Sequence, residues 1–300
     1  MGDEPPSKRD GDETERLAAG LYLVATPIGT AADITLRALN ILRRADVIAA
    51  EDTRRTRQLL GLHGVALGKR AMVAYHDHNG AAQRPHLLRR IAAGDAVALV
   101  SDAGTPLVAD PGWRLVREAI DAGLPVTAAP GASALLAALA VAGLPTDRFL
   151  FAGFPPPRSG ERGRWITGLA AVDATLVLYE APQRLAETLA ALAEGLGPRD
   201  AAICRELTKR FEEVRRGRLA DLAADQAAAP PPKGEIVLVI GPPEPVAVVA
   251  ADLDAALRSA MAASSLRDAA REVADALGLP RKTAYQRALT LAQDEGSDAC

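Results

Sequence analysis

Residues 99–112 of the chain read "LVSDAGTPLVADPG". Val97–Val100 form an apolar run typical of a buried strand, and a helical pattern begins at Trp113. A connection between a strand and the next helix usually needs a short turn and one capping residue. This one holds two glycines, two prolines and two aspartates within eleven residues. We therefore expect its main chain to be shaped around a small polar ligand.

Strands and helices alternate on both sides of this stretch. Helical patterns such as 33–44 and 113–123 separate short apolar runs that end in turn residues. The runs predict strands at 21–27, 45–52, 72–77, 96–102 and 125–131. Strands that alternate with helices of about ten residues predict βαβ units and a mostly parallel sheet.

The pattern changes after an apolar helix at 132–143. Clear helices are predicted only at 161–170 and 183–195. Five further strands are predicted at 148–156, 174–182, 200–207, 212–219 and 234–242. The sequence therefore predicts an α/β fold of two domains, 21–143 and 144–242, the second with a mixed sheet.

The ends of the chain differ from these domains. We expect residues 1–20 to be a disordered tail, because six acids against three bases in the first sixteen residues account for the whole net charge of −3. Residues 243–252 form a proline-rich linker and 290–300 a second tail. Between these two segments, 253–289 has a helix–turn–helix outline, its first helix ending at Gly278 and its second beginning near Pro280. A helical cap, a dimerisation hairpin and a nucleic-acid contact all fit this module.

Composition excludes several classes of protein. Cys204 and Cys300 make neither a disulfide framework nor a metal-ligand set, and His76 and His78 lack partners for a zinc site, so we expect no metal. The first residues are charged where a signal peptide is apolar. The longest apolar stretch, 132–145, is too short to span a bilayer. We expect a cytoplasmic protein without membrane contact.

Polar and turn-forming residues follow each predicted strand of the first domain. In open α/β sheets ligands bind at the carboxyl ends of the strands. Neither a G-x-G-x-x-G after the first strand nor a P-loop motif is present. Glycines leave main-chain N–H and C=O groups accessible. These groups can form hydrogen bonds to a ligand that carries carboxylate, amino and ring-nitrogen groups. The five loops are "TPIGTAADIT" (26–35), "EDTRRTR" (51–57), "YHDHN" (75–79), "SDAGTPLVADPG" (101–112) and "PGASA" (130–134).

These loops, with "LYEAPQRL" (178–185), "CRELTKRFEE" (204–213) and "GEIVLVI" (234–240), resemble the tetrapyrrole-methylase superfamily in order and spacing. "AEDTR", "YHDHN" and "RELTK" resemble its small-subunit (16S) ribosomal RNA (cytidine-2′-O)-methyltransferase branch. The likeness runs from about Leu21 to Ile240 and continues to about Leu289. Asp77 stands where the branch more usually has Glu, which keeps a carboxylate.

The resemblance implies a dimer of two-domain subunits, with S-adenosylmethionine bound in the cleft between the domains. The implied substrate is a cytidine ribose of small-subunit ribosomal RNA, free or in the assembled subunit. The loop at 101–112 would then be a main-chain cradle for the cofactor. The cofactor contacts implied in this way are Pro27, Ile28, Asp102, Gly104, Thr105, Pro106, Val108, Ala132, Ser133, Tyr179 and Leu207.

Methyl transfer to a ribose hydroxyl is an in-line displacement, in which alignment of donor and acceptor supplies much of the acceleration. The hydroxyl is a poor nucleophile, so a nearby base or cation would help. Asp52 also fits as a helix cap, and Lys209 as a solvated partner of Glu206. The sequence leaves the choice open among the candidates Asp52, His76, Glu180 and Lys209.

RNA binding requires phosphate contacts, for which arginine clusters are candidates, although such clusters also occur as solvated helix faces. We favour 155–165, which reads as a Gly- and Pro-rich loop ending in a tryptophan that can stack on a base. The candidate RNA contacts are Arg54, Arg158, Arg162, Arg164, Trp165, Arg281, Lys282 and Arg287.

Two other functions fit the same residues. One is a methyltransferase of this fold that acts on a tetrapyrrole or another small molecule. The other is a non-catalytic module that binds S-adenosylmethionine or RNA. The basic segments favour RNA over a tetrapyrrole, and the acids and lysine near the cleft favour an enzyme over a passive module.

Overall fold

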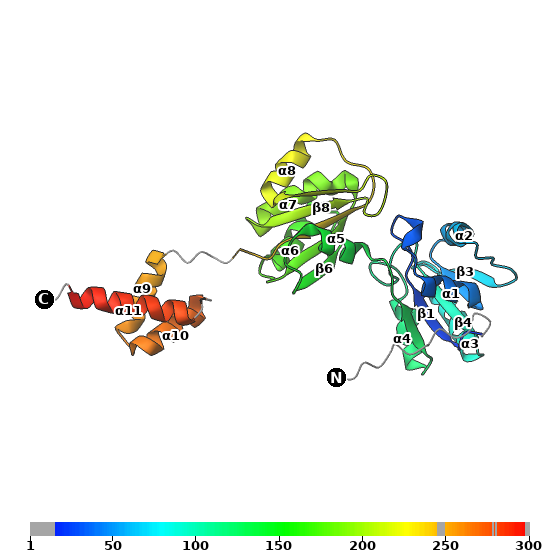
Figure 1. The fold of residues 1–300 in the computed structure, drawn as a ribbon, viewed down its shortest axis with the longest axis horizontal. Coiled ribbons are helices and arrows are strands. Elements are labelled where there is room, and N and C mark those ends of the chain that lie inside the picture. The colour runs from blue at the N-terminus through cyan, green and yellow to red at the C-terminus, as the bar shows by residue number, and fades with distance from the viewer. Residues whose placement is uncertain (1–15, 245–249, 278, 280, 298–300) are drawn as a thin grey trace. The chain divides into compact units, whose positions relative to one another are not determined.

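The computed structural model describes residues 16–244, 250–277, 279 and 281–297 (Figure 1). The chain divides into two compact units, Met1–Pro243 and Glu244–Cys300. The larger unit contains two five-stranded sheets, and the smaller contains three helices within its described residues. Among the described residues no helix is long and apolar enough to cross a membrane.

The first sheet has the order β3-β2-β4-β1-β5, and each of its strand pairs is parallel. Its central strand is buried at every residue, as expected where helices cover both faces. The carboxyl ends of its strands therefore meet at one edge. The strands are β1 (Gly20–Val24), β2 (Val47–Ala50), β3 (Ala71–Ala74), β4 (Ala96–Val100) and β5 (Val126–Ala129).

Alternate side chains of these strands pack into two separate cores. Ile48 joins Leu42 and Leu60 on one face, while the adjacent Val47 joins Leu87 and Leu115 on the other. This follows from the two-residue period of a strand. The covering helices are α1 (Leu36–Arg44), α2 (Thr53–Leu62), α3 (Gly80–Ala92) and α4 (Trp113–Asp121), with a 3-10 turn η1 (Ala31–Asp33).

The second sheet is mixed, with the order β6-β7-β10-β8-β9. β6 and β7 are parallel, and the other neighbours are antiparallel. Its strands are β6 (Phe149–Gly153), β7 (Thr175–Glu180), β8 (Asp200–Arg205), β9 (Glu213–Arg218) and β10 (Ile236–Ile240). Its helices are α6 (Ser159–Ala170), α7 (Leu185–Leu196) and α8 (Leu219–Ala228), with a 3-10 turn η2 (Pro182–Arg184). The sequence pattern does not predict α8, because its alanine-rich composition gives a weak helical period.

Helix α5 (Ala134–Ala142) packs on the second sheet. Its buried residues Ala138 and Leu139 contact a cluster that includes Val177 and Val239. The sequence-based division between residues 143 and 144 grouped this helix with the first domain, because a change of pattern along the chain does not reveal on which sheet a connecting helix packs.

The loop after β1 reaches into the second domain. Ile28 is buried in the cluster formed by α5 and the second sheet. The Thr30 amide donates to Thr208 Oγ1 at 3.2 Å, and the Thr30 hydroxyl donates to the Thr208 carbonyl. A Cβ on Gly29 would lie 2.5 Å from Lys209 Cγ and 3.0 Å from the Leu207 carbonyl oxygen. Glycine is therefore required for the close approach of these two loops.

The smaller unit consists of α9 (Ala250–Met261), α10 (Leu266–Leu277) and α11 (Arg281–Ser297) around a shared apolar core. Residues from Ala250 are helical although sequence analysis assigned 243–252 to a linker, and α11 crosses the predicted tail at 290–300. The predicted helix ends Gly278 and Pro280 lie outside the described residues, as does most of the predicted tail at 1–20. Within that tail, Arg16 pairs with Asp46 at 3.3 Å, and β1 already begins at Gly20.

Replacing Gly29 with Ala should destabilise the protein by about 1–3 kcal/mol, because the loop of the second domain must move to accept the methyl group. The free energy of unfolding is measured with urea. Gly61→Ala is the matched control: this glycine is in α2, and a Cβ added there would meet no atom of the described residues within 4 Å, so alanine should be neutral or stabilising. Equal effects of the two changes would contradict the required close approach.

Candidate active site

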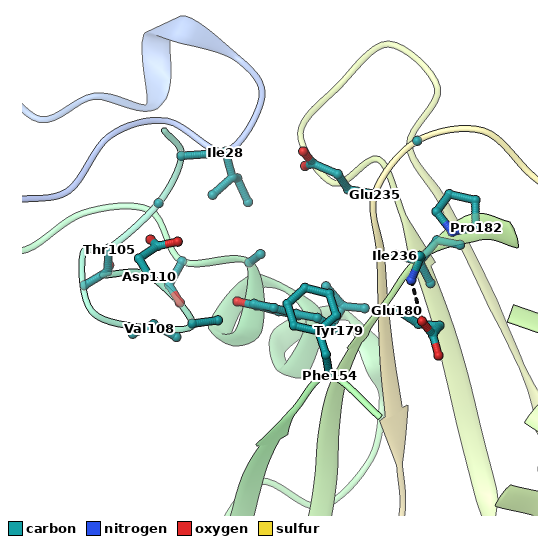
Figure 2. Close-up of a pocket in the computed structure, with 18 residues that line it drawn as sticks. Ile28, Thr105, Val108, Asp110, Phe154, Tyr179, Glu180, Pro182, Glu235 and Ile236 are labelled. Carbon is teal, nitrogen blue, oxygen red and sulfur yellow. Dashed lines mark hydrogen bonds between the residues drawn. The ribbon is translucent and has the colours of Figure 1, made fainter. Parts of the chain in front are cut away.

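A cavity of about 410 Å³ lies between the two domains of the larger unit (Figure 2). The first domain supplies Ile28 and residues 103–105 and 108–110, and the start of the connecting helix α5 supplies Ser133 and Ala134. The second domain supplies Phe154, residues 179–182 and residues 234–237. Three of the five strand-end loops identified in the sequence thus line one site.

The loop at 101–112 is fixed by main-chain hydrogen bonds to the end of β1. The Thr26 amide donates to the Gly104 carbonyl at 2.8 Å, and the Gly104 amide donates to the Thr26 carbonyl at 3.0 Å. The Thr105 hydroxyl donates to the Ala132 carbonyl at 3.0 Å. Leu107 and Ala109 have positive φ angles of 76° and 63°. Such strained residues are typical of functional loops, and here they turn main chain toward the cavity.

Asp110 places a carboxyl group in the wall of this cavity, opposite Tyr179 (Figure 2). Burial and the nearby charge of Glu51 raise its pKa to about 6, against the influence of a hydrogen bond from Ser101. Asp110 carries no distinct functional signal in the sequence, since aspartate before "PG" is usual in a turn. The only signal was the excess of turn residues in this loop.

The structure engages three of the four catalytic candidates, Asp52, Glu180 and Lys209, in hydrogen bonds or ion pairs within the protein. Asp52 caps α2, accepting a hydrogen bond from the Arg54 amide at 2.8 Å, and hydrogen bonds from Arg54 hold its pKa well below the usual range. The buried Glu180 carboxylate accepts a hydrogen bond from the Ala181 amide at 2.6 Å and pairs with Arg184 (Figure 2).

Of the four candidates, only Glu180 lines the 410 Å³ cavity. Lys209 Nζ is 2.8 Å from the Glu206 carboxylate and 2.9 Å from that of Glu235. Of these three residues, Glu235 lines the cavity. His76 lines a separate cavity at the end of β3.

The expected cofactor contacts occupy three kinds of position. Those that line the 410 Å³ cavity are Ile28, Gly104, Thr105, Val108, Ser133 and Tyr179. Pro27 and Asp102 line a neighbouring cavity of about 260 Å³, where Asp102 also accepts a hydrogen bond from the Asp52 amide at 2.9 Å. The remaining three support the walls, and they are Pro106, Ala132 and Leu207.

The segment at 155–165 is not a loop over its second half, because α6 begins at Ser159. Arg162 is only 2% exposed and pairs with Glu187, and Trp165 packs against the core of the second domain. Contrary to our expectation, the buried Arg162 side chain stabilises the fold. Trp165 is partly buried, and its contact with a base stays a prediction. The glycines of α6 suggested a loop, although helix packing accommodates them. Arg158 and Arg164 are exposed.

Most of the remaining candidate RNA contacts already form ion pairs within the protein. Arg54 pairs with Asp52, Arg281 with Asp275, and Arg287 with Asp254 across the smaller unit. Lys282 is exposed on α11. No group of three or more potential metal-ligating side chains occurs within the described part of the chain.

A family model described as Tetrapyrrole (Corrin/Porphyrin) Methylases matches residues 20–223. The chain belongs to this family. Among solved structures, this tetrapyrrole methylase resembles a diphthine synthase with a TM-score of 0.58 at 21% identity, covering 74% of this chain and 89% of that one. The methyltransferase CobJ gives a TM-score of 0.56 at 20% identity, with coverages of 75% and 94%. These likenesses confirm the predicted two-sheet α/β fold.

Curated relatives are more similar still to this tetrapyrrole methylase. A protein of Mesorhizobium japonicum named ribosomal RNA small subunit methyltransferase I is 52% identical over 93% of this chain and 95% of its own length. A protein of the same name from Erythrobacter litoralis is 51% identical, with coverages of 92% and 97%. Residues 247–292 match a model described as the RsmI C-terminal HTH domain, which confirms the predicted helix–turn–helix character of the module.

Asp110→Asn should stabilise the protein at pH 8 but not at pH 4. Because the pKa of Asp110 in the folded protein is about 6, above the usual 3.8, the folded state holds this proton more tightly than the unfolded state does. Wild-type stability should therefore fall as the pH rises from about 4 to about 6, by about 1–2 kcal/mol after allowance for partial solvent screening. Urea unfolding across this range measures the difference. The exposed Asp173→Asn is the control. If Asp110→Asn increased the free energy of unfolding by the same amount at every pH, the raised pKa of Asp110 would be contradicted.

Proposed function

We propose that this chain is a methyltransferase that uses S-adenosylmethionine to methylate the 2′-hydroxyl of a cytidine in small-subunit ribosomal RNA. The observation that carries the proposal is the 410 Å³ interdomain cavity walled by strained main chain at 104–109. It occurs in a chain about half identical to proteins named ribosomal RNA small subunit methyltransferase I. That substrate would place the reaction in the cytoplasm.

The volume of the cavity, about 410 Å³, lies within the usual range of small-molecule sites, and its lining combines apolar side chains with a few polar groups. Gly104 has a φ of 79°, and a Cβ there would lie 3.3 Å from Ile28 Cγ2, so a larger residue would narrow the cradle. We assign the polar part of the cofactor to main chain and hydroxyls at 104–108 and Ser133. Phe154 and Tyr179, with ring centroids 5.5 Å apart, provide an aromatic wall for the adenine. Pro27, Asp102, Pro106, Ala132 and Leu207 would support this shell.

The bound cofactor would supply an electrophilic methyl group. The ribose hydroxyl must then lose its proton as the new carbon–oxygen bond forms. We assign acceptance of this proton to Asp110, whose carboxyl group is in the cavity wall. Its pKa of about 6 leaves it ionised at neutral pH yet more basic than an exposed aspartate. Asp52, Glu180, His76 and Lys209 would then have structural or substrate-binding roles.

We propose a homodimer because of the edge of the second sheet. β6 is an outer strand, and its first two residues, Phe149 and Leu150, are exposed apolar side chains. Exposed apolar edge strands tend to associate unless they are covered. A second copy of the chain would cover this one.

The purified protein should transfer labelled methyl groups from S-adenosylmethionine to small ribosomal subunits from cells that lack the enzyme. Nucleoside digestion should recover the label in 2′-O-methylcytidine. Gly104→Val should abolish both transfer and calorimetric binding of S-adenosylmethionine, because a β-branched side chain narrows the cradle. Its thermal unfolding is recorded to confirm that it is folded. Label in an added uroporphyrinogen but not in RNA would overturn the proposal in favour of a tetrapyrrole substrate.

Removing residues 244–300 should preserve S-adenosylmethionine affinity and raise the KM for small subunits about tenfold or more. This follows if the smaller unit binds ribosomal RNA through exposed basic residues such as Lys282. Lys282→Ala in the full chain should raise the KM by a smaller factor and reduce its dependence on salt. A truncated protein with a lower melting temperature and an unchanged KM would show that the unit serves stability instead.

A further inference from the structure

A third cavity, of about 240 Å³, lies where β3, α3 and α4 meet in the first domain. Residues 111–114 line it, whereas the preceding residues 108–110 line the 410 Å³ cavity. One short piece of main chain therefore forms a wall of both cavities. Whatever occupies the smaller cavity is held next to the proposed site of methyl transfer. The side chains that line it include Tyr75, His76, Asp77, Arg84, Trp113 and Arg114.

Trp113 belongs to none of the apolar cores formed by the described residues. Its residue is 62% exposed, although Leu115 and Ala119 of the same helix are fully buried. The other tryptophan, Trp165, packs against a core. An exposed indole beside a polar cavity offers a flat surface on which a nucleic-acid base can stack.

Two guanidinium groups accompany this indole. Arg114 lies over the Trp113 ring, with its Cζ 5.4 Å from the ring centroid, and no carboxylate pairs with it in the described part of the chain. Arg84 is held in place by Glu118, whose carboxylate is 2.7 Å from Arg84 Nε. Glu118 offsets the charge of Arg84, and the cavity lining itself contributes one carboxylate, Asp77. Arg114 is therefore the guanidinium of this lining that is available to an anionic ligand.

His76 adds a polar atom that lacks a partner. Its Nδ1 is shielded from solvent and has no hydrogen-bond partner among the described residues. A buried polar atom without a partner destabilises the protein unless a ligand or water satisfies it. A ligand with hydrogen-bonding groups would remove this cost.

We propose that this cavity is a subsite for a nucleotide next to the methylated one, with its base stacked on Trp113 and its phosphate bound by Arg114 and Arg84. The inference rests on the proposed function, since it names the part of the RNA substrate that this cavity recognises. An unpaired nucleotide provides both chemistries that the site offers: a flat base for the indole and a negative charge for the arginines.

Fluorescence titration with single-stranded octacytidylate tests the site without requiring catalysis. Stacking should quench the tryptophan emission of the wild type, and the quench should be lost in Trp113→Phe, which removes the reporting indole. Arg114→Ala should weaken the binding and reduce its dependence on salt. An equal quench in wild type and Trp113→Phe would overturn the subsite.

Methylation kinetics provide the second measurement. Trp113→Ala should lower kcat/KM for small subunits about tenfold or more, and Trp113→Phe should retain most of it, because a base can still stack on the phenyl ring. The affinity for S-adenosylmethionine and the melting temperature should not change. Phe211→Ala is the matched control, since Phe211 is 63% exposed and carries Arg210 at the same 5.4 Å. Its kinetics should remain those of the wild type.

The outcomes separate the two proposals. Normal methylation by Trp113→Ala would overturn the subsite and leave the proposed function intact. A Trp113-dependent quench by octacytidylate in a protein that methylates no ribosomal RNA would overturn the function and leave a nucleotide site. If Trp113→Ala had the mass of a monomer while Arg114→Ala bound octacytidylate as the wild type does, Trp113 would belong to the interface between two copies of the chain. That result would overturn the subsite.

Discussion

Two main-chain hydrogen bonds between Thr26 and Gly104 join the loop after β1 to the loop after β4. Because of these bonds, residues 101–112 do not run straight from β4 into α4, and the loop contains non-glycine residues at positive φ. The cost of that strain has to be offset by the surrounding contacts. The result is a rigid wall of main chain whose two sides line different cavities.

The same β1 loop also fastens the two domains together. Ile28 is buried among side chains of the second sheet and α5, and Gly29 lets the loop at 207–209 come within contact distance. Helix α5 packs on the second sheet, although β5, the strand that precedes it in the chain, belongs to the first sheet. The interdomain cavity therefore lies beside a joint built from apolar burial and main-chain contact, which should keep its walls in a fixed relation.

Asp52 and Asp110 show that a local sequence motif does not reveal whether a carboxylate faces a cavity. "AEDTR" places Asp52 at the end of a strand, where an active-site carboxylate is plausible, yet its side chain caps α2 and pairs with Arg54. Asp110 lies in a turn motif with many structural precedents, yet it is the aspartate with a raised pKa in the cavity wall. A cap is formed by near neighbours, whereas the environment of Asp110 depends on Glu51 and on the fold of the whole loop.

The sequence by itself determined the alternation of strands and helices, the parallel first sheet, the mixed second sheet, the helical module and the loops that line the site. These features follow from periodicity and turn chemistry within about ten residues, which the order of amino acids expresses directly. The tertiary structure alone decided that Arg162 and Trp165 are packed, that α5 covers the second sheet and that Trp113 is exposed. Burial and ion pairing depend on partners far along the chain, such as Glu187 for Arg162 and Thr208 for Thr30, and no local pattern specifies which distant surfaces meet.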